Sequence, residues 1–205
     1  MVHFCDELFL GLVLVAFLLE SSCCINNEVP ANNHGIEPLA IIDDVGEDIQ
    51  RNELKAVIPV LSAEWSVQFK FNLHGNHTGH NYWCNILQLK QNGPLYHKYG
   101  ARTPYVTFDS IEKKILIDSA VNNNWMYRRY IHRQIHFNTE YNVEIHQRYK
   151  SGGVYKYSIF LDGEEVHSTD NTQAQQFYDV KVFVSNQDGY PCLGSVSDLK
   201  ITNYL

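Results

Sequence analysis

The stretch VYKYSIFLDGEEVHS, residues 154–168, decides the fold. It consists of two runs of β-forming residues joined by Asp162-Gly163, a pair typical of a two-residue type I′ hairpin turn. Both central positions of that turn need a positive φ, which glycine adopts freely and aspartate tolerates. Odd-numbered residues 155–161 point to one face and even-numbered residues 156–160 to the other. One of these faces must be buried for the hairpin to be stable, so the stretch predicts a packed antiparallel sheet.

The chain from Trp65 onward has the same character. Residues 65–74 alternate between apolar odd positions and polar even positions, which is the period of a half-buried strand. No long apolar stripe of helical period interrupts the series, so a parallel α/β sheet is excluded and an all-β, two-sheet antiparallel β-sandwich is predicted. The further predicted strands are 83–89, 104–109, 114–119, 127–136, 141–149, 154–161, 164–169, 178–185 and 196–204.

Three regions are predicted along the chain. Residues 1–24 contain the apolar run LFLGLVLVAFLL. This run is shorter than the roughly 20 residues of a membrane span and has the length of a signal-peptide core. A secreted, extracellular protein is therefore expected, with an uncleaved anchor as the alternative, and an N-terminal segment 25–64 is followed by a domain 65–205. No second long apolar stretch follows, so no membrane span is expected after signal cleavage.

The net charge of −7 is unevenly distributed. Residues 25–64 carry eight acidic residues against Arg51 and Lys55, whereas the remainder of the chain from residue 65 has a small basic excess. The acidic segment is interpreted as a linker, a propeptide or a short helix over residues 48–57. The domain has no stripe of lysine and arginine, so nucleic acid is excluded as a partner.

The predicted mature domain contains Cys84 and Cys192. An even pair in an oxidising compartment most simply forms one disulfide, here closing a loop of about 109 residues, although two buried free thiols are the alternative. Asn76-His77-Thr78 is the N-glycosylation sequon of the sequence, and it lies in the polar stretch HGNHTGHN. Asn76 is therefore expected to carry a glycan on a surface loop.

The order of segments along the domain resembles the concanavalin A-like lectin/glucanase superfamily. These segments are WSVQFKF, WCNILQLK, GARTPYVTFD, KKILIDSAVNNN, YNVEIHQRY, YKYSIFLDGEEVHS, FYDVKVFVSN and GSVSDLKITNY. Within this group of laminin G-like, pentraxin-like and galectin-like jelly rolls, the chain is most similar to secreted invertebrate proteins, some of them from skeletal organic matrix. The resemblance implies that the first and last strands lie side by side and brings Cys84 and Cys192 within reach of each other.

No catalytic motif of this superfamily is found in the sequence. Glycanases on this fold need two carboxylates on one strand face, in a Glu-x-Asp-x-x-Glu pattern, whereas Glu164 and Glu165 follow a hairpin turn and point to opposite faces. His136-Phe137-Asn138 resembles the start of the galectin motif, but the arginine that should follow is absent, and a turn is predicted instead. The chain is therefore expected not to be an enzyme, with a glycan-active enzyme kept as an alternative.

Two loops offer candidate metal ligands. His74, His77 and His80 recur at intervals of three, and imidazole is a good ligand for zinc or copper. The resemblance also allows calcium, for which Asp118 beside residues 122–124, and Asn186 with Asp188, supply oxygen ligands. A polar loop and Asn-rich turns without any ion are the alternatives, so no cofactor is required.

The best candidate for sugar binding is a cluster of aromatic and polar residues. Sugar recognition needs an aromatic platform with hydrogen-bonding groups around it. The cluster consists of Asn122, Asn123, Asn124, Trp125, Tyr127 and Arg128, with Arg129 and Tyr130 beside them. Arg102-Thr103-Pro104 is read as a strand-entry turn. The sequence thus predicts a secreted binding module for a glycan or an extracellular matrix component, with a structural component of an extracellular or mineralised matrix as the alternative.

Overall fold

The computed structural model describes residues 34–75, 82–91, 97–186 and 189–205. Thirteen β-strands make up the regular structure of these residues. In these ranges no helix is long and apolar enough to cross a membrane. The predicted signal peptide 1–24 and the sequon at Asn76 lie outside the described residues, so both stay predictions.

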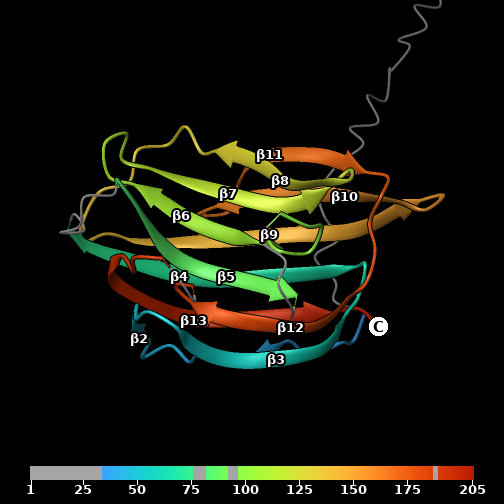
Figure 1. The fold of residues 1–205 in the computed structure, drawn as a ribbon, viewed down its shortest axis with the longest axis horizontal. Helices are drawn as coiled ribbons and strands as arrows, with labels where there is room; N and C mark the ends of the chain where they lie inside the picture. The colour runs from blue at the N-terminus through green and yellow to red at the C-terminus, as the bar shows by residue number, and fades with distance from the viewer. Residues whose placement is uncertain (1–33, 76–81, 92–96, 187–188) are drawn as a thin grey trace, which may run out of the picture.

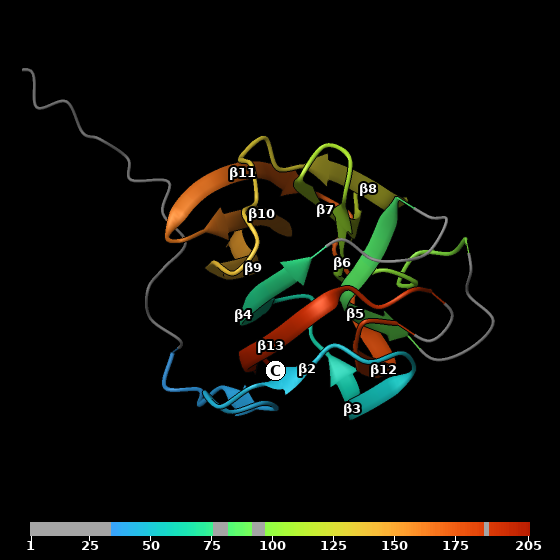
Figure 2. The same cartoon turned by 90° about the vertical axis from the view of Figure 1, so that its left-hand side faces the viewer.

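The strands form two antiparallel sheets that pack face to face (Figures 1 and 2). The seven-stranded sheet has the order β1-β13-β4-β9-β10-β11, with β2 also paired to β13, and the six-stranded sheet has the order β3-β12-β5-β6-β7-β8. The strands of the first sheet are β1 (Leu39–Ala40), β2 (Glu47–Asp48), β4 (Trp65–Gly75), β9 (Glu140–Ser151), β10 (Val154–Leu161), β11 (Glu164–Asn171) and β13 (Leu193–Asn203). Those of the second are β3 (Glu53–Leu61), β5 (Trp83–Gln91), β6 (Tyr105–Asp109), β7 (Lys114–Val121), β8 (Asn124–Tyr130) and β12 (Phe177–Val184). The predicted two-sheet sandwich is confirmed.

The hairpin predicted over residues 154–168 is present. β10 and β11 pair antiparallel with Leu161 opposite Glu164, so Asp162 and Gly163 form a two-residue loop. Their φ angles are 52° and 80°, in the left-handed region that a type I′ turn requires. Ile159 and Leu161 are fully buried between the sheets. The buried face is therefore the one made of odd-numbered residues.

The core lies between the two sheets and follows from the alternation of each strand. In β4 the odd-numbered residues from Trp65 to Leu73 are buried, and the even-numbered ones are half-buried or exposed. β4 lies next to β13, so the predicted neighbourhood of the first and last strands of the domain is confirmed. Cys84 and Cys192 form a disulfide within this core, and the alternative of two free thiols is thereby excluded.

The described part of the N-terminal acidic segment, residues 34–64, contributes strands to the sandwich rather than forming a linker. β3 pairs with β12 along its length, and β1 and β2 pair with β13. β3 is an edge strand, so only some of its apolar side chains are buried. Acidic residues on its solvent-exposed side therefore lower the stability of the fold only a little. Glu47 and Glu53 both pair with Lys55, whose side chain is mostly buried. The structured domain thus begins before residue 65, and residues 48–57 contain strands where a short helix was an alternative.

The eighth strand is shorter than predicted. The sequence predicts a strand over residues 127–136, whereas β8 ends at Tyr130. Ile131 and Ile135 are both buried, but the backbone around them forms a loop instead of a strand. Their backbone N–H groups donate to the carbonyls of Ile115 and Lys113, which holds this loop beside the start of β7. Asn138 has a φ of 57°, as expected for the turn predicted there.

Candidate functional site

The outer face of the six-stranded sheet carries a buried carboxylate between two arginines. Asp118 lies on β7 between Ile117 and Ser119, which both point into the sandwich, so its side chain points to the outer face. Arg128 on β8 donates its Nε–H and Nη2–H to the two carboxylate oxygens, at 2.8 and 3.0 Å. Arg102 also donates to Asp118. The hydrogen bonds that Arg128 donates to Asp118 raise the pKa of Arg128, and both guanidinium groups are held in fixed positions.

Aromatic rings flank this ion-pair cluster on both sides. The guanidinium carbon of Arg128 lies 4.8 Å from the centre of the Trp83 ring. The guanidinium of Arg102 lies 5.0 Å from Trp125 and 5.1 Å from Tyr105. Stacking on an aromatic face stabilises an arginine and fixes its plane. The result is a surface of alternating aromatic rings and guanidinium groups, which we call the aromatic–arginine face: Trp83, Arg102, Tyr105, Asp118, Trp125 and Arg128.

Tyr105 connects this face to the neighbouring loops. Its side chain is directly opposite Asp118 in the β6–β7 register. The hydroxyl donates to the side-chain oxygen of Asn85 and accepts from the side-chain amide of Asn186, at 3.0 Å for the second bond. Burial raises the pKa of Tyr105 to about 12, so its hydroxyl stays protonated at physiological pH. Tyr105 is thus a fixed neutral member of the face.

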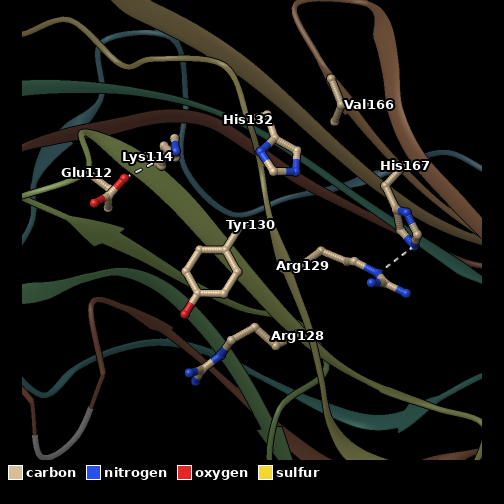
Figure 3. A pocket seen from close by; sticks show the side chains of 8 residues that line it. All are labelled: Glu112, Lys114, Arg128, Arg129, Tyr130, His132, Val166 and His167. Atoms are coloured by element: carbon tan, nitrogen blue, oxygen red, sulfur yellow. Dashed lines mark hydrogen bonds and ion pairs between the residues drawn. The ribbon is translucent and has the colours of Figure 1, made fainter.

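A pocket of about 440 Å³ lies beside the aromatic–arginine face, along the edge strand β8 (Figure 3). We call it the β8-edge pocket. Arg128 is common to the pocket and the aromatic–arginine face. In Figure 3 Arg128 and Tyr130 lie on one side of the strand, and Arg129 and His167 on the other. The pocket is lined by Glu112, Lys114, Arg128, Arg129, Tyr130, His132, Val166 and His167.

Arg129 is oriented by neutral partners in the pocket. Its Nε–H donates to Nε2 of His167 at 3.1 Å, and its Nη2 donates to the Tyr127 hydroxyl. Its guanidinium also stacks on the Tyr127 ring at 4.3 Å. Nε2 of His167 can accept this bond only without a proton. Burial and the adjacent Arg129 lower the pKa of His167, in agreement with a neutral imidazole.

The outer face of the seven-stranded sheet has its charges arranged in opposite pairs. Lys156 pairs with Glu165 at 2.7 Å, and Arg148 with Glu64 at 2.9 Å. His146 on β9 bonds to Glu144 at 3.2 Å, and this bond is the main cause that lowers the pKa of Glu144. Because these charges compensate each other, this face presents less net charge to a ligand than the β8-edge pocket does.

The structure separates the predicted sugar-binding residues into two groups. Trp125 and Arg128 both belong to the aromatic–arginine face, joined through Arg102. Tyr127 instead points inward and packs edge-on against Tyr157 at 6.3 Å. The three asparagines form the turn between β7 and β8: Asn122 and Asn123 have positive φ, and Asn124 accepts the backbone N–H of Met126.

Asn122 has a structural role in this turn. Its side-chain amide donates to the carbonyl of Asp170, and its side-chain oxygen accepts from the backbone N–H of Thr172, both at 2.8 Å. These bonds join the β7–β8 turn to the end of β11. The side chain of Asn122 is therefore engaged with protein groups of the opposite sheet.

Three of the candidate metal ligands, Asp118, Asn186 and His74, lie within the described residues. Asp118 is engaged with two arginines, and Asn186 bonds to Tyr105 and to the backbone N–H of Gly189. His74 lies exposed near the end of β4. His77, His80 and Asp188 lie outside the described residues. Within the described ranges no group of three or more His, Cys, Asp or Glu is placed to hold a metal ion.

Several residues of the face were not among the predicted site residues. Trp83 and Tyr105 were not singled out, and Arg102 was interpreted as part of a turn. The signal for Tyr105 was available, since a hairpin turn between residues 109 and 114 pairs Tyr105 with Asp118. Arg102 lies in a loop, so strand periodicity gives no indication of its position.

No protein-family model and no curated protein matches the sequence. Among solved structures, a native heptameric SAP-like pentraxin from Limulus polyphemus is similar with a TM-score of 0.49 and 14% identity, over 74% of this chain and 69% of that chain. An endo-β-1,4-glucuronan lyase from Trichoderma reesei has a TM-score of 0.48 and 14% identity, over 86% and 78%. A Trypanosoma rangeli sialidase has a TM-score of 0.49 and 10% identity, over 68% of this chain and 20% of the sialidase.

These likenesses concern the fold alone. The sheet order confirms the predicted two-sheet antiparallel β-sandwich, and membership of the concanavalin A-like superfamily stays a resemblance. The expectation that the chain is not an enzyme was wrong as a firm statement, because sialidases and alginate and glucuronan lyases are among the similar structures. One fold hosts both binding and catalysis. Glu144 on β9 and Glu165 on β11 reach the same sheet face on either side of Phe160, a placement that a carboxylate motif within one strand does not describe.

Proposed function

We propose that the protein is a secreted module that binds carbohydrate through the aromatic–arginine face. The observation that supports this most directly is the pairing of Trp125 and Trp83 with guanidinium groups fixed by Asp118. Sugar rings combine an apolar face with a rim of hydroxyls, and binding sites for them combine apolar aromatic surface with a few fixed polar groups. The aromatic–arginine face supplies both within one surface.

The arginines are suited to hydroxyl recognition because they are already oriented. Arg128 uses its Nε and Nη2 toward Asp118, and Arg102 uses its Nη1, so other N–H donors of both groups point away from the carboxylate. A donor that is fixed before binding loses little conformational entropy when the ligand arrives. The half-buried tryptophans beside them add apolar contact area without reorganisation.

Secretion is part of this proposal and is supported by the disulfide. Disulfides persist in oxidising compartments, and Cys84–Cys192 is formed within the core. In the alternative role, as a structural matrix component, the acidic segment would be the adhesive part. That segment contributes β1, β2 and β3 to the sandwich, and Glu47 and Glu53 pair with Lys55. We therefore favour binding of a glycan, free or within an extracellular matrix.

The test is a glycan array probed with the full secreted chain, with and without calcium, followed by affinity measurement on the best ligand. Trp125→Ala is expected to weaken binding about tenfold, the equivalent of an aromatic contact worth about 1.4 kcal/mol. Tyr178→Ala is the matched control, since Tyr178 is an exposed aromatic residue on β12. Retention of no glycan, or equal loss in both variants, would refute the proposal.

A further inference from the structure

We propose that the β8-edge pocket binds an anionic substituent, a carboxylate or a sulfate, of the glycan, so that the preferred ligand is an acidic carbohydrate. This inference rests on the proposed function and specifies its ligand class. The pocket is lined by three cationic side chains and two histidines against one acid, Glu112. A charge in this pocket is available to a ligand only where a neighbouring group of opposite charge does not already compensate it.

Two of the three cations are already paired with acids. Lys114 lies 3.3 Å from Glu112, and Arg128 donates to both oxygens of Asp118. Both hydrogen bonds of Arg129 within the described residues go instead to neutral groups, the Tyr127 hydroxyl and the imidazole of His167. The positive charge of Arg129 is therefore not compensated by a carboxylate there. A half-buried cation of this kind attracts an anion more strongly than a paired one.

The position of Arg129 is also fixed before any ligand binds. The guanidinium stacks on the Tyr127 ring and is held at Nε by His167. These contacts leave Nη1 and the second hydrogen of Nη2 for a ligand, which is the planar arrangement that matches carboxylate and sulfate oxygens. Figure 3 shows Arg129 and His167 together on one side of the pocket.

The surroundings of the pocket indicate that the anion belongs to a sugar. Tyr130, 44% exposed, lines the pocket and presents an aromatic ring at its mouth. Arg128 connects the pocket directly to Trp83 and the aromatic–arginine face. A volume of about 440 Å³ lies in the range of small-molecule sites. One charged sugar unit in the pocket can thus continue into further units on the face.

The experiment compares matched polysaccharides that differ only in their charge. The carboxylate arm uses a polyuronate and its carboxyl-reduced form, and the sulfate arm uses a sulfated glycan and its desulfated form. The full secreted chain is measured by calorimetry at two salt concentrations. The acidic form of at least one pair is expected to bind about tenfold or more tightly than its neutral form, with affinity falling as salt rises.

Arg129→Gln is the test variant and Lys200→Gln the matched control. Lys200 lies on β13 in the other sheet, and its replacement removes the same charge from the surface. Arg129→Gln is expected to lower affinity for the acidic form about tenfold while leaving the neutral form within about twofold, and Lys200→Gln to leave both within about twofold. Lys114→Gln, which leaves Arg129 and its two partners in place, is expected to give a smaller loss in the same direction.

Two results would overturn the inference. The first is equal affinity of the wild-type chain for both members of each pair. The second is an effect of Arg129→Gln no larger than that of Lys200→Gln in variants that melt as the wild type does. Equal binding of both members of each pair would leave carbohydrate binding intact and remove only the anion site, whereas binding of neither member of either pair would refute the proposed function itself.

Discussion

Replacement of Asp118 by asparagine tests whether the aromatic–arginine face is organised by one buried charge. Asp118 is 2% exposed and accepts hydrogen bonds from Arg102 and Arg128. Asp118→Asn keeps the size of the side chain but removes the negative charge, so two guanidinium groups face each other without compensation. The nearest ring partners, Trp83 and Trp125, cannot replace a carboxylate.

The magnitude follows from burial. Breaking one partner of a buried ion pair costs about 3–5 kcal/mol of stability. Arg102 and Arg128 keep 21% and 26% of their side-chain surface exposed, so water compensates part of the lost charge. We therefore expect the lower end, about 3 kcal/mol, corresponding to a fall in melting temperature of about 6–12 °C for a chain of this size.

The assay is urea unfolding followed by tryptophan fluorescence, with Asp170→Asn as the matched control. Asp170 pairs with Lys150 at 3.0 Å, and both side chains are about half exposed. Such a surface pair contributes about 0–1 kcal/mol. If Asp118→Asn lowered the free energy of unfolding by less than about 1 kcal/mol, no more than the control, the face would not depend on Asp118 and our reasoning would be wrong.

Three further predictions concern the fold. Cys192→Ser removes the disulfide between Cys84 and Cys192, which are 108 residues apart in sequence. In the chain-entropy model this change should lower the free energy of unfolding, measured without reductant, by about 4–5 kcal/mol. An unchanged urea midpoint would contradict this prediction. Gly163→Ala should cost about 1 kcal/mol, because φ is +80° although nothing lies within 4 Å of the added methyl, whereas Gly75→Ala, equally open but without a positive φ, should cost less. Burial raises the pKa of Glu165, but hydrogen bonds from Lys156 and Ser168 outweigh it and hold the pKa low, and that of Glu144 is low mainly through His146. Their stabilisation is complete above about pH 4.5, the unfolded value, and is lost as pH falls through the folded values. Burial lowers the pKa of His167 from its ordinary value of 6.5. The neutral imidazole therefore stabilises the folded state fully above about pH 6.5, and this stabilisation is lost as the pH falls below that value. Urea midpoints between pH 3 and 8 should therefore fall on acidification, and His167→Gln should flatten the higher step; a flat profile in the wild type would contradict this.

The strands and the hairpin were predictable because they depend on local chemistry. Asp162-Gly163 specifies a turn by its φ preferences, and the alternation of residues 65–74 specifies which face is buried. The pairing of Cys84 with Cys192 could be predicted, because these are the two cysteines of the predicted mature domain. β3 was not predicted, because an edge strand buries only part of its apolar residues and its acids resemble those of a linker.

The site was harder to predict, because two irregularities create it. β8 contains a β-bulge, where the pairing shifts between Ser119–Tyr127 and Val121–Asn124. Strict alternation would place Trp125 and Arg128 on opposite faces, but the extra residue rotates the strand, and Trp125 reaches Arg102 on the outer face. Arg102 itself belongs to the loop that leads into β6. Neither contact follows from the period of any strand.

The same bulge explains why the cluster predicted from neighbouring residues divides in two. Asn122 and Asn123 adopt the left-handed conformations of the turn, and Tyr127 continues the inward alternation toward Tyr157. Only residues that meet Asp118 or its arginines remain on the face, and these come from β5, β6, β7, β8 and the loop before β6. A binding surface built across several strands depends on the register in which each strand pairs with the next. A two-residue turn fixes the register of its own two strands, so that hairpin can be predicted from the sequence. A site that spans four strands requires the register of every pair among them.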